Sequence, residues 1–433
     1  MRIIHITAGA GGRICGSCLH DNTLVRALQA RGRDAILVPA YVPTTTDDVN
    51  VAIDHVVMGG VNVWLQEHLP LLRYTPRFFD RLFDSPRLLA WLSSRTGSAR
   101  PANLGPLTVS SLEGEAGHQR KEVRKLVRWL AHDVQPDVVH LSNALLLGLA
   151  REIRAATNAR VVCSLSGEDI FIDQIPQPDR ERIWELLRER AGDVDQFVAL
   201  NQFFAREMGG RMGISPEQVT IIPHGVDLAA FPVDPPDLVA RRDERAGRLV
   251  IGFLARACPE KGLDQAIRAL ALLAGNHDVE LRAAGATVDA ERIYLEGCLA
   301  LAEELGVADR FRWLGQVDRG EKLALLRSID LFVMPATHPE AKGLPVIEAM
   351  AAGLPVIAPA EGTFPELLDG EQAGILHAPR EPEDLARAVA ELAAAGERAA
   401  AIGRHGHRLA RSRHAADSMA AAHEALYERL VGG

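Results

Sequence analysis

Cysteine is scarce in this chain of 433 residues, which contains only five: Cys15, Cys18, Cys163, Cys258 and Cys298. An odd and sparse set argues against a secreted disulfide framework and favours a reducing compartment. Apolar runs are short as well, and none approaches the roughly 18 residues of a membrane-spanning helix. The opening MRIIHITAGAGG indicates a buried strand that enters a glycine-rich loop, without the features of a signal peptide. We therefore expect a cytoplasmic protein.

Positive charge is in deficit too, since 48 Lys and Arg stand against 57 Asp and Glu and give a formal net charge of -9. A chain this acidic is not expected to bind nucleic acid over its surface. The deficit is uneven, because residues 64–132 hold 11 basic and 6 acidic residues. Basic residues surround an apolar helix face in the last part of this segment: Arg120, Lys121, Arg124, Lys125 and Arg128. The segment is either an ordinary helix with a solvated face or a surface for anionic lipid or a lipid-linked acceptor.

The composition that is present, 47% hydrophobic and 24% charged, is typical of a soluble globular protein of two or three domains. Short, continuous apolar segments alternate with amphipathic helical patterns along the chain. The apolar segments are 3–7, 35–38, 137–141, 160–165 and 197–200 in the first half, and 249–254, 279–284, 311–314, 330–334 and 355–358 in the second. Strands of this kind belong to parallel sheets covered by helices on both faces.

A proline-rich, charged stretch interrupts the alternation between residues 223 and 248 and marks a domain boundary. The fold class is therefore α/β, with two doubly wound, Rossmann-like parallel-sheet domains. We predict an N-terminal domain over 1–230 with a basic insertion at about 64–132, and a second domain over 231–410. A closing helix over 411–433 is expected to pack back toward the N-terminal domain.

In open α/β sheets the ligands bind in loops at the carboxyl ends of the strands. One such loop, after the strand at 330–334, contains Glu340, Gly343 and Leu344 and leads into a helix that carries Glu348. The N–H groups of Gly343 and Leu344 can point at an anion, which the helix dipole favours. The two carboxylates suit the hydroxyls of a phosphorylated sugar. The alternative is a solvated loop with an acidic residue near a helix start.

A second loop, after the strand at 249–254, places Arg256 and Lys261 at a strand–helix junction. Two cations there can neutralise a diphosphate leaving group, although an ordinary surface loop with ion pairs has the same pattern. A third motif, Pro223-His224-Gly225-Val226-Asp227, fits either an interdomain hinge or a simple turn.

These motifs, in this order, resemble the retaining, nucleotide-sugar-dependent glycosyltransferases of family 4, also called group 1, which have the GT-B fold. The resemblance covers nearly the whole chain and is strongest over 221–365, through PHGVD, GFLARACPEKG, LGQV and the pair Glu340 and Glu348 followed by EAMAAGLPVIAP. It implies two domains that face each other across a cleft, with the donor on the C-terminal domain and the acceptor on the N-terminal one.

The resemblance also implies roles for single residues. Arg256 and Lys261 match the diphosphate-binding cations, and Glu340 matches the glutamate that contacts the donor sugar; these three are the predicted catalytic residues. The predicted donor-binding residues are Gly343 and Leu344 near the phosphates, Glu348 at the ribose, Val317 at the base and Gly12 in the N-terminal glycine-rich loop.

The N-terminal domain departs from the family pattern. Many members carry two histidines after the strand read here as 137–140, whereas here His140 is followed by Ser142 and Asn143. Ser166 stands where many members have a further histidine. The predicted acceptor- or sugar-binding residues are therefore His140, Asn143, Glu168 and Asp169. For His140 the alternative is a strand-end histidine hydrogen-bonded in the core.

We expect a retaining hexosyltransferase-type enzyme that moves a sugar from a nucleoside-diphosphate sugar to a hydroxyl of a small molecule, glycan or lipid-linked acceptor. No cofactor and no metal are expected, since Asp47-Asp48 is only a weak match to a metal motif and the pair Cys15 and Cys18 lacks further ligands at zinc spacing. The two cysteines fit a packed turn or a redox pair. The alternatives for the chain are a sugar-nucleotide epimerase or phosphorylase of the same fold, or a non-catalytic sugar-nucleotide-binding protein. The location is cytoplasmic, with peripheral contact at the inner membrane face through 64–132.

Overall fold

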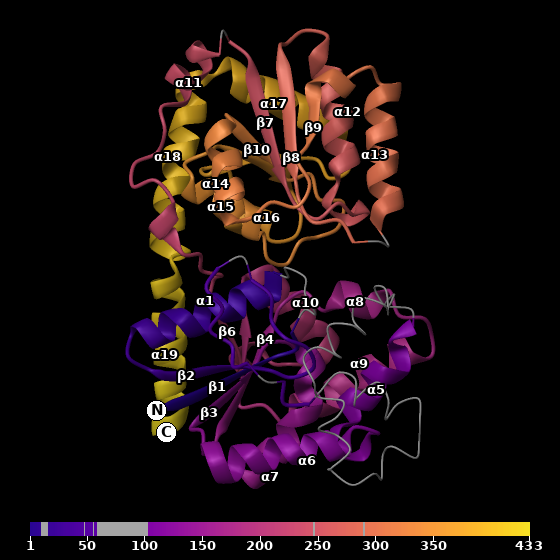
Figure 1. Cartoon of the computed structure of the whole chain (residues 1–433), viewed down its shortest axis with the longest axis vertical. Helices are drawn as coiled ribbons and strands as arrows, with labels where there is room; N and C mark the ends of the chain where they lie inside the picture. The colour runs from indigo at the N-terminus through magenta and orange to yellow at the C-terminus, as the bar shows by residue number, and fades with distance from the viewer. Residues whose placement is uncertain (10–15, 47, 55, 59–102, 246, 289–290) are drawn as a thin grey trace. The chain divides into compact units, whose positions relative to one another are not determined.

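A computed structural model of the chain describes residues 1–9, 16–46, 48–54, 56–58, 103–245, 247–288 and 291–433 (Figure 1). The chain divides into two compact units, one formed by 1–225 with 416–433 and the other by 226–415. The first boundary falls at 225/226, against 230/231 from the sequence. The last residues of the chain, 416–433, belong to the first unit.

The first unit is built on a six-stranded sheet in which all pairs are parallel, in the order β2-β1-β3-β4-β5-β6. Its strands are β1 (Arg2–Thr7), β2 (Asp34–Pro39), β3 (Val138–Leu141), β4 (Arg160–Leu165), β5 (Gln196–Ala199) and β6 (Val219–Ile221). Nearly every residue of β1, β3 and β4 is buried, as a sheet covered on both faces requires.

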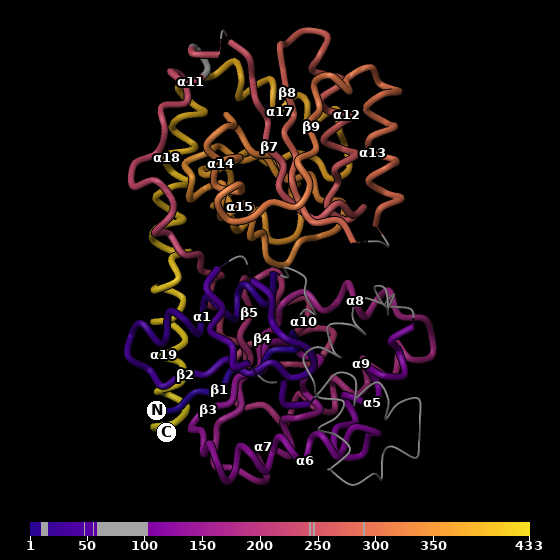
Figure 2. Tube along the Cα trace, viewed as in Figure 1, coloured from indigo at the N-terminus to yellow at the C-terminus, as the bar shows by residue number. Residues whose placement is uncertain are grey.

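Helices cover both faces of this sheet (Figure 1). They are α1 (Gly16–Ala30), α5 (Gly105–Glu113), α6 (Arg120–Trp129), α7 (Ala150–Ala156), α8 (Asp169–Asp173), α9 (Asp179–Ala191), α10 (Gln202–Met212) and α19 (Ala416–Gly432). The closing helix α19 packs on α1. Arg31, which directly follows α1, pairs with Asp417 and Glu424 of α19, each at 2.8 Å. Met1 and Leu430 pack against one core cluster, so both chain ends lie in this unit (Figure 2).

The second unit repeats the architecture with the strand order β12-β11-β10-β7-β8-β9, again all parallel. Its strands are β7 (Leu249–Leu254), β8 (Val279–Ala284), β9 (Phe311–Trp313), β10 (Leu331–Val333), β11 (Val356–Pro359) and β12 (Gly374–His377). Its helices are α11 (Leu238–Glu244), α12 (Leu263–Ala274), α13 (Arg292–Glu304), α14 (Arg319–Ser328), α15 (Leu344–Ala351), α16 (Phe364–Leu367), α17 (Pro382–Ala394) and α18 (Gly396–Arg413). Helix α12 packs beside α13 and α17, while α15 packs beside α18 (Figure 1).

Each sheet has one point at which the strand order reverses. In the second unit the chain runs outward from β7 to β9 and then returns to place β10 on the other side of β7. The loops after β7 and β10 therefore leave the sheet side by side, and this is the position at which doubly wound sheets bind ligands. These are the loops at 255–262 and 334–343, which the sequence marked for chemistry.

Candidate functional site

The loops after β7 and β10 are joined by backbone contacts. The N–H of Thr337 donates to the carbonyl of Glu260 at 3.1 Å, and its hydroxyl donates to the carbonyl of Pro259 at 2.7 Å. Gly262 has a φ of 72°, and a Cβ there would lie 1.9 Å from the carbonyl oxygen of Pro335. Only glycine allows this approach, so the sequence permits the two loops to touch.

The contact brings Lys261 and Glu340 together as an ion pair. Their side chains are 24% and 12% exposed. Burial opposes ionisation of the Glu340 carboxyl, but the Lys261 ammonium outweighs burial and holds the pKa of Glu340 below its usual range. The backbone of Glu340 packs closely against the loop after β11. The Glu340 carbonyl accepts the N–H of Thr363 at 2.8 Å, and a Cβ on Gly362 would lie 2.5 Å from the Glu340 nitrogen. The site thus holds an ionised carboxylate beside a cation, on a backbone held by these contacts.

Helix α15 begins at Leu344, directly after this loop. Gly343 precedes it in the left-handed region, at a φ of 65°, and as the N-cap residue it has no side chain with which to cap the helix. The first N–H groups of a helix have no acceptor within the helix, so an uncapped start can receive an anion. Gly343 and Leu344 lie at this start, three and four residues beyond Glu340.

Glu348 lies on the buried side of α15 and pairs with Lys322 of α14, whose Nζ is 2.6 Å from Oε1 of the glutamate. Both side chains are mostly buried, at 14% exposed for Lys322 and 9% for Glu348. Val317 lies just ahead of α14, half-buried against the core of the unit. Nothing in the local sequence pairs residues 322 and 348, so Lys322 is not among the residues predicted from the sequence.

Arg256 is half-exposed at the end of β7, and its Nε is 3.2 Å from Oε1 of Glu291. Glu291 lies in the connection between β8 and α13, and no local sequence signal pairs it with Arg256. The structure thus brings Lys261 directly to Glu340 and provides Arg256 with a carboxylate from a different loop.

In the first unit, the predicted acceptor-side residues His140, Asn143 and Glu168 make hydrogen bonds within the unit. The ring of His140 is fully buried, with one nitrogen 2.6 Å from the Tyr427 hydroxyl and the other 2.8 Å from that of Ser164. The Asn143 side chain accepts the N–H of Leu145 at 3.1 Å and caps a short helix.

The Glu168 carboxylate accepts two backbone N–H groups, from Ala144 and Ser166, each at 2.7 Å. Asp169, the fourth of these residues, is 7% exposed at the start of α8. The contacts of His140 and Glu168 satisfy their buried polar groups, and the role of all four residues toward an acceptor stays a prediction.

A buried histidine cluster surrounds His140, and its members are too far apart in the sequence to be predicted as a group. His5 of β1 pairs with Asp21 of α1 at 2.9 Å, and its ring centroid is 4.6 Å from that of His140. His20 of α1 stacks on His224 at the same centroid distance.

His423 of α19 completes the cluster, with its ring centroid 5.6 Å from that of His140. Burial lowers the pKa of His423 to about 4 and holds those of His20 and His140 well below the usual value. These three rings are therefore neutral at neutral pH.

Two family models match adjoining stretches of the chain. One, described as "Glycosyl transferases group 1", matches residues 237–408, and the other, described as "Glycosyltransferase Family 4", matches residues 93–230. The chain belongs to the group 1 glycosyltransferases of the family 4 type. The first model spans all of the paired loops described above, and the second covers the predicted acceptor side.

Relatives in this family include the D-inositol 3-phosphate glycosyltransferase of Segniliparus rotundus. It is 31% identical over 252 residues, which are 57% of this chain and 55% of that protein. This chain therefore spans about half the length of that relative. The GDP-mannose-dependent alpha-(1-6)-phosphatidylinositol monomannoside mannosyltransferase of Mycobacterium tuberculosis is 29% identical over 298 residues, 67% of this chain and 74% of that protein.

Solved structures of similar fold include HepE of Anabaena in complex with UDP. Its TM-score is 0.69 at 19% identity, and the match covers the full length of both chains. At this identity the likeness shows the fold, and with the two parallel sheets it confirms the predicted two-domain GT-B architecture.

Several predictions for this family member fall wholly or partly outside the described residues. Gly12, Cys15 and Asp47 are among them, and so is the part of the basic segment before residue 103. Cys18 is described and lies buried in α1. Within the described ranges, no group of His, Cys, Asp or Glu has the geometry of a metal site, and no helix is long and apolar enough to cross a membrane.

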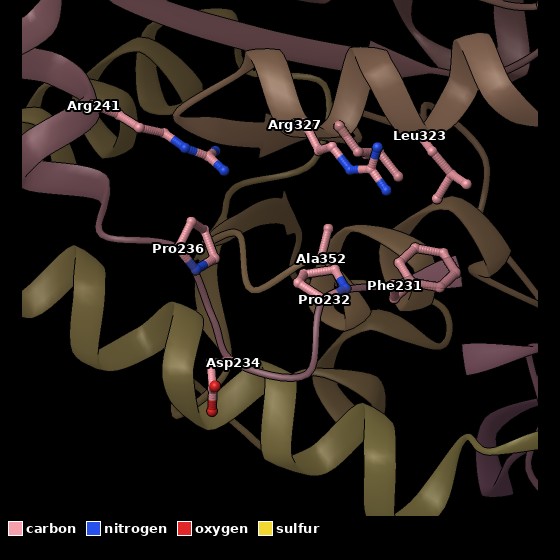
Figure 3. Close-up of a pocket in the computed structure, with 9 residues that line it drawn as sticks. Phe231, Pro232, Asp234, Pro236, Arg241, Leu323, Arg327 and Ala352 are labelled. Carbon is pink, nitrogen blue, oxygen red and sulfur yellow. The ribbon is translucent and has the colours of Figure 1, made fainter. Parts of the chain in front are cut away.

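A separate hollow of about 240 Å³ lies in the second unit, between the segment 231–236 and α14 (Figure 3). Phe231, Leu323 and Leu326 give it apolar walls, and the guanidinium groups of Arg241 and Arg327 reach its edge. None of the predicted site residues lines it. The hollow is therefore distinct from the paired loops at the reversal of the sheet.

Proposed function

We propose that this protein is a retaining glycosyltransferase that moves a sugar from a nucleoside-diphosphate sugar to an acceptor hydroxyl without a metal or other cofactor. The observation that carries the proposal is the pairing of Lys261 with Glu340 at the reversal point of the second sheet, beside the uncapped start of α15. A cation, a carboxylate and the N–H groups of a helix start at one place suit a phosphorylated sugar.

In this proposal Lys261 and Arg256 bind the diphosphate, together with the N–H groups at Gly343 and Leu344. The diphosphate competes for Lys261, and Glu340 then turns from the ammonium to the hydroxyls of the donor sugar. Glu348 accepts hydrogen bonds from the ribose, Val317 contacts the base through its main chain, and Gly12 approaches the diphosphate. The cations stabilise the charge that develops on the leaving group.

The reaction proceeds on one face of the sugar. The bond between the anomeric carbon and the phosphate oxygen breaks, and a bond to the acceptor oxygen forms on the same side. The acceptor's proton passes to the departing phosphate, so no side-chain base is needed. The acceptor lies near the strand ends of the first unit, among His140, Asn143, Glu168 and Asp169.

We propose that the acceptor is a small molecule, a glycan or a lipid-linked sugar, and that the basic segment 64–132 contacts anionic lipid at the inner membrane face. Helix α6 supports this part. Arg120, Arg124 and Arg128 are exposed along one line of the helix at intervals of four residues, while Val123, Leu126 and Val127 are buried. A row of exposed cations attracts an anionic surface at about 1 kcal/mol for each residue that reaches it.

The donor is tested first, by a thermal-shift screen of UDP, GDP and ADP and their hexose derivatives. The best donor is then incubated with D-inositol 3-phosphate and with a phosphatidylinositol mannoside, acceptors suggested by the relatives' names. Glycoside formation with retained anomeric configuration, unaffected by EDTA, is expected. Epimerised donor without acceptor, or tight donor binding without turnover on any acceptor, contradicts the proposal.

The site is tested by Glu340→Ala and Lys261→Ala. Each should lower turnover about 100-fold or more, because each removes a group that acts on the reacting sugar phosphate. Matched controls are Arg268→Ala on α12 and Glu304→Ala on α13, both exposed residues of the same unit. Full activity in both site variants refutes the assignment.

Membrane contact is tested by co-sedimentation with vesicles that contain phosphatidylserine, at low and high salt. The parent should bind at low salt, and the triple variant Arg120→Ser, Arg124→Ser, Arg128→Ser should bind several-fold less. A parent that stays in the supernatant at low salt contradicts this part and leaves the transferase proposal untouched.

A further inference from the structure

The contact between Lys322 and Glu348 has properties that an ordinary surface ion pair lacks. The two charged atoms are 2.6 Å apart, and both side chains are mostly buried. Surface pairs contribute little because water screens them, whereas a buried carboxylate is costly to keep ionised without a neighbouring cation. Lys322 supplies that cation to Glu348.

The helix that carries Lys322 is fixed at its first turn. Asp318 accepts the N–H of Glu321 at 2.8 Å, and the Glu321 side chain accepts the N–H of Asp318 at 2.9 Å, which forms a capping box. Arg319 pairs with Asp227 at 3.1 Å. Three contacts thus hold the helix turn from which the Lys322 side chain extends toward Glu348.

We infer that Lys322 is a positioning residue for the nucleotide ribose: it holds the Glu348 carboxylate ionised and oriented so that it accepts hydrogen bonds from the ribose hydroxyls. This inference rests on the proposed function, in which Glu348 faces the ribose. Lys322 takes one side of Oε1, and the carboxylate is thereby kept in one orientation against α14. Without the ammonium, the carboxylate either binds a proton or turns toward water, and both outcomes remove an acceptor for a hydroxyl.

The inference separates ribose recognition from the rest of nucleotide binding. Loss of Lys322 should weaken binding only for nucleotides that carry the ribose hydroxyls. A role confined to stabilising the unit would weaken the binding of every nucleotide alike. Comparison of a ribonucleotide with its 2′,3′-dideoxy form therefore distinguishes the two roles.

The experiment measures dissociation constants by calorimetry for UDP, GDP and ADP, and for the 2′,3′-dideoxy form of whichever binds the parent most tightly. In Lys322→Met the affinity for the ribonucleotide should fall about 10-fold or more, because hydrogen bonds to a charged acceptor are lost. The affinity for the dideoxy form should change by less than about twofold. In Glu348→Gln, addition of Lys322→Met should have no further effect, since both changes remove the same interaction.

Two further variants keep the result interpretable. Lys322→Arg retains the charge and should recover most of the discrimination between the two nucleotides. Arg327→Met removes a cation from the same helix at an exposed position and should bind both nucleotides like the parent. Circular dichroism spectra of each variant confirm that it is folded.

Equal loss for the ribonucleotide and the dideoxy form, or unchanged ribonucleotide binding in Lys322→Met, overturns the role of Lys322 while the proposed function stands. Failure of the parent to bind any of the three nucleotides overturns the proposed function and this inference with it.

Discussion

The buried histidines predict that acid destabilises the first unit, and His423 is the residue at which the effect can be measured. Its ring is fully buried and lies 5.6 Å from that of His140. One nitrogen contacts the carbonyl of Met419 at 2.9 Å, and the other has no hydrogen-bond partner within the described part of the chain. Burial lowers the pKa of this imidazole to about 4. An unfolded chain has a histidine pKa of about 6.5, so unfolding releases the ring to bind a proton.

The sign follows from this difference. Above about pH 6.5 His423 is neutral in both the folded and the unfolded state, so this residue makes no pH-dependent contribution to the free energy of unfolding there. As the pH falls from about 6.5 toward about 4, only the unfolded state gains the proton, so stability decreases. At about pH 4.5 the loss from this one ring is about 2.5 kcal/mol, and it levels off below the folded pKa of about 4. His20 and His140 add to the loss in the same direction, since burial lowers their pKa values too.

The assay is urea unfolding at steps between about pH 7.5 and about pH 4.5, followed by tryptophan fluorescence, to which Trp184, buried in the same unit, contributes. His423→Phe removes the titrating ring and loses its hydrogen bond to Met419 at every pH. The variant should therefore be less stable than the parent at neutral pH and should lose about 2.5 kcal/mol less than the parent on acidification. His132→Gln, at an exposed histidine of the same unit, should follow the parent throughout. Parallel pH curves for the parent and His423→Phe would refute the reasoning.

Two further predictions concern backbone contacts. Gly262→Ala should separate the loops after β7 and β10, because its Cβ would lie 1.9 Å from the carbonyl oxygen of Pro335 and because alanine disfavours this backbone conformation. The variant should bind nucleoside diphosphate at least about 10-fold more weakly than the parent. It should also unfold at a lower urea concentration. Gly275→Ala, where nothing lies within 4 Å, should match the parent in both measurements, and equal behaviour of the two variants would contradict the argument. The Asn201 side chain accepts the N–H of Phe204 at 2.8 Å and caps α10. Asn201→Ala should therefore lower the free energy of unfolding by about 1 kcal/mol. An unchanged urea midpoint would show that the cap contributes nothing to stability.

Much of the fold could be predicted from the sequence because its signals are local. The segment 249–254 is a buried strand along its whole length, as its continuous apolar run indicates. The closing helix predicted over 411–433 overlaps the end of α18 at Arg413 and the whole of α19, Ala416–Gly432. The motifs around Lys261 and Glu340 follow strands, so the general rule for doubly wound sheets was enough to expect both at a ligand site.

Side-chain partners were decided by the tertiary structure alone. Lys322 and Glu348 lie 26 residues apart, His20 and His224 lie 204 apart, and His140 meets Tyr427 across 287 residues. Local patterns indicate which residues form a strand or helix and which of them are buried, because both depend on the spacing of apolar residues along the chain and on adjacent residues in the sequence. They contain no information about which helix packs against which, since that depends on strand order and on the return of α19 to the first unit. For this protein the sequence determined the two sheets, the family and the loops that carry the site, while packing between distant elements decided which charge neutralises which carboxylate and which histidines share a core.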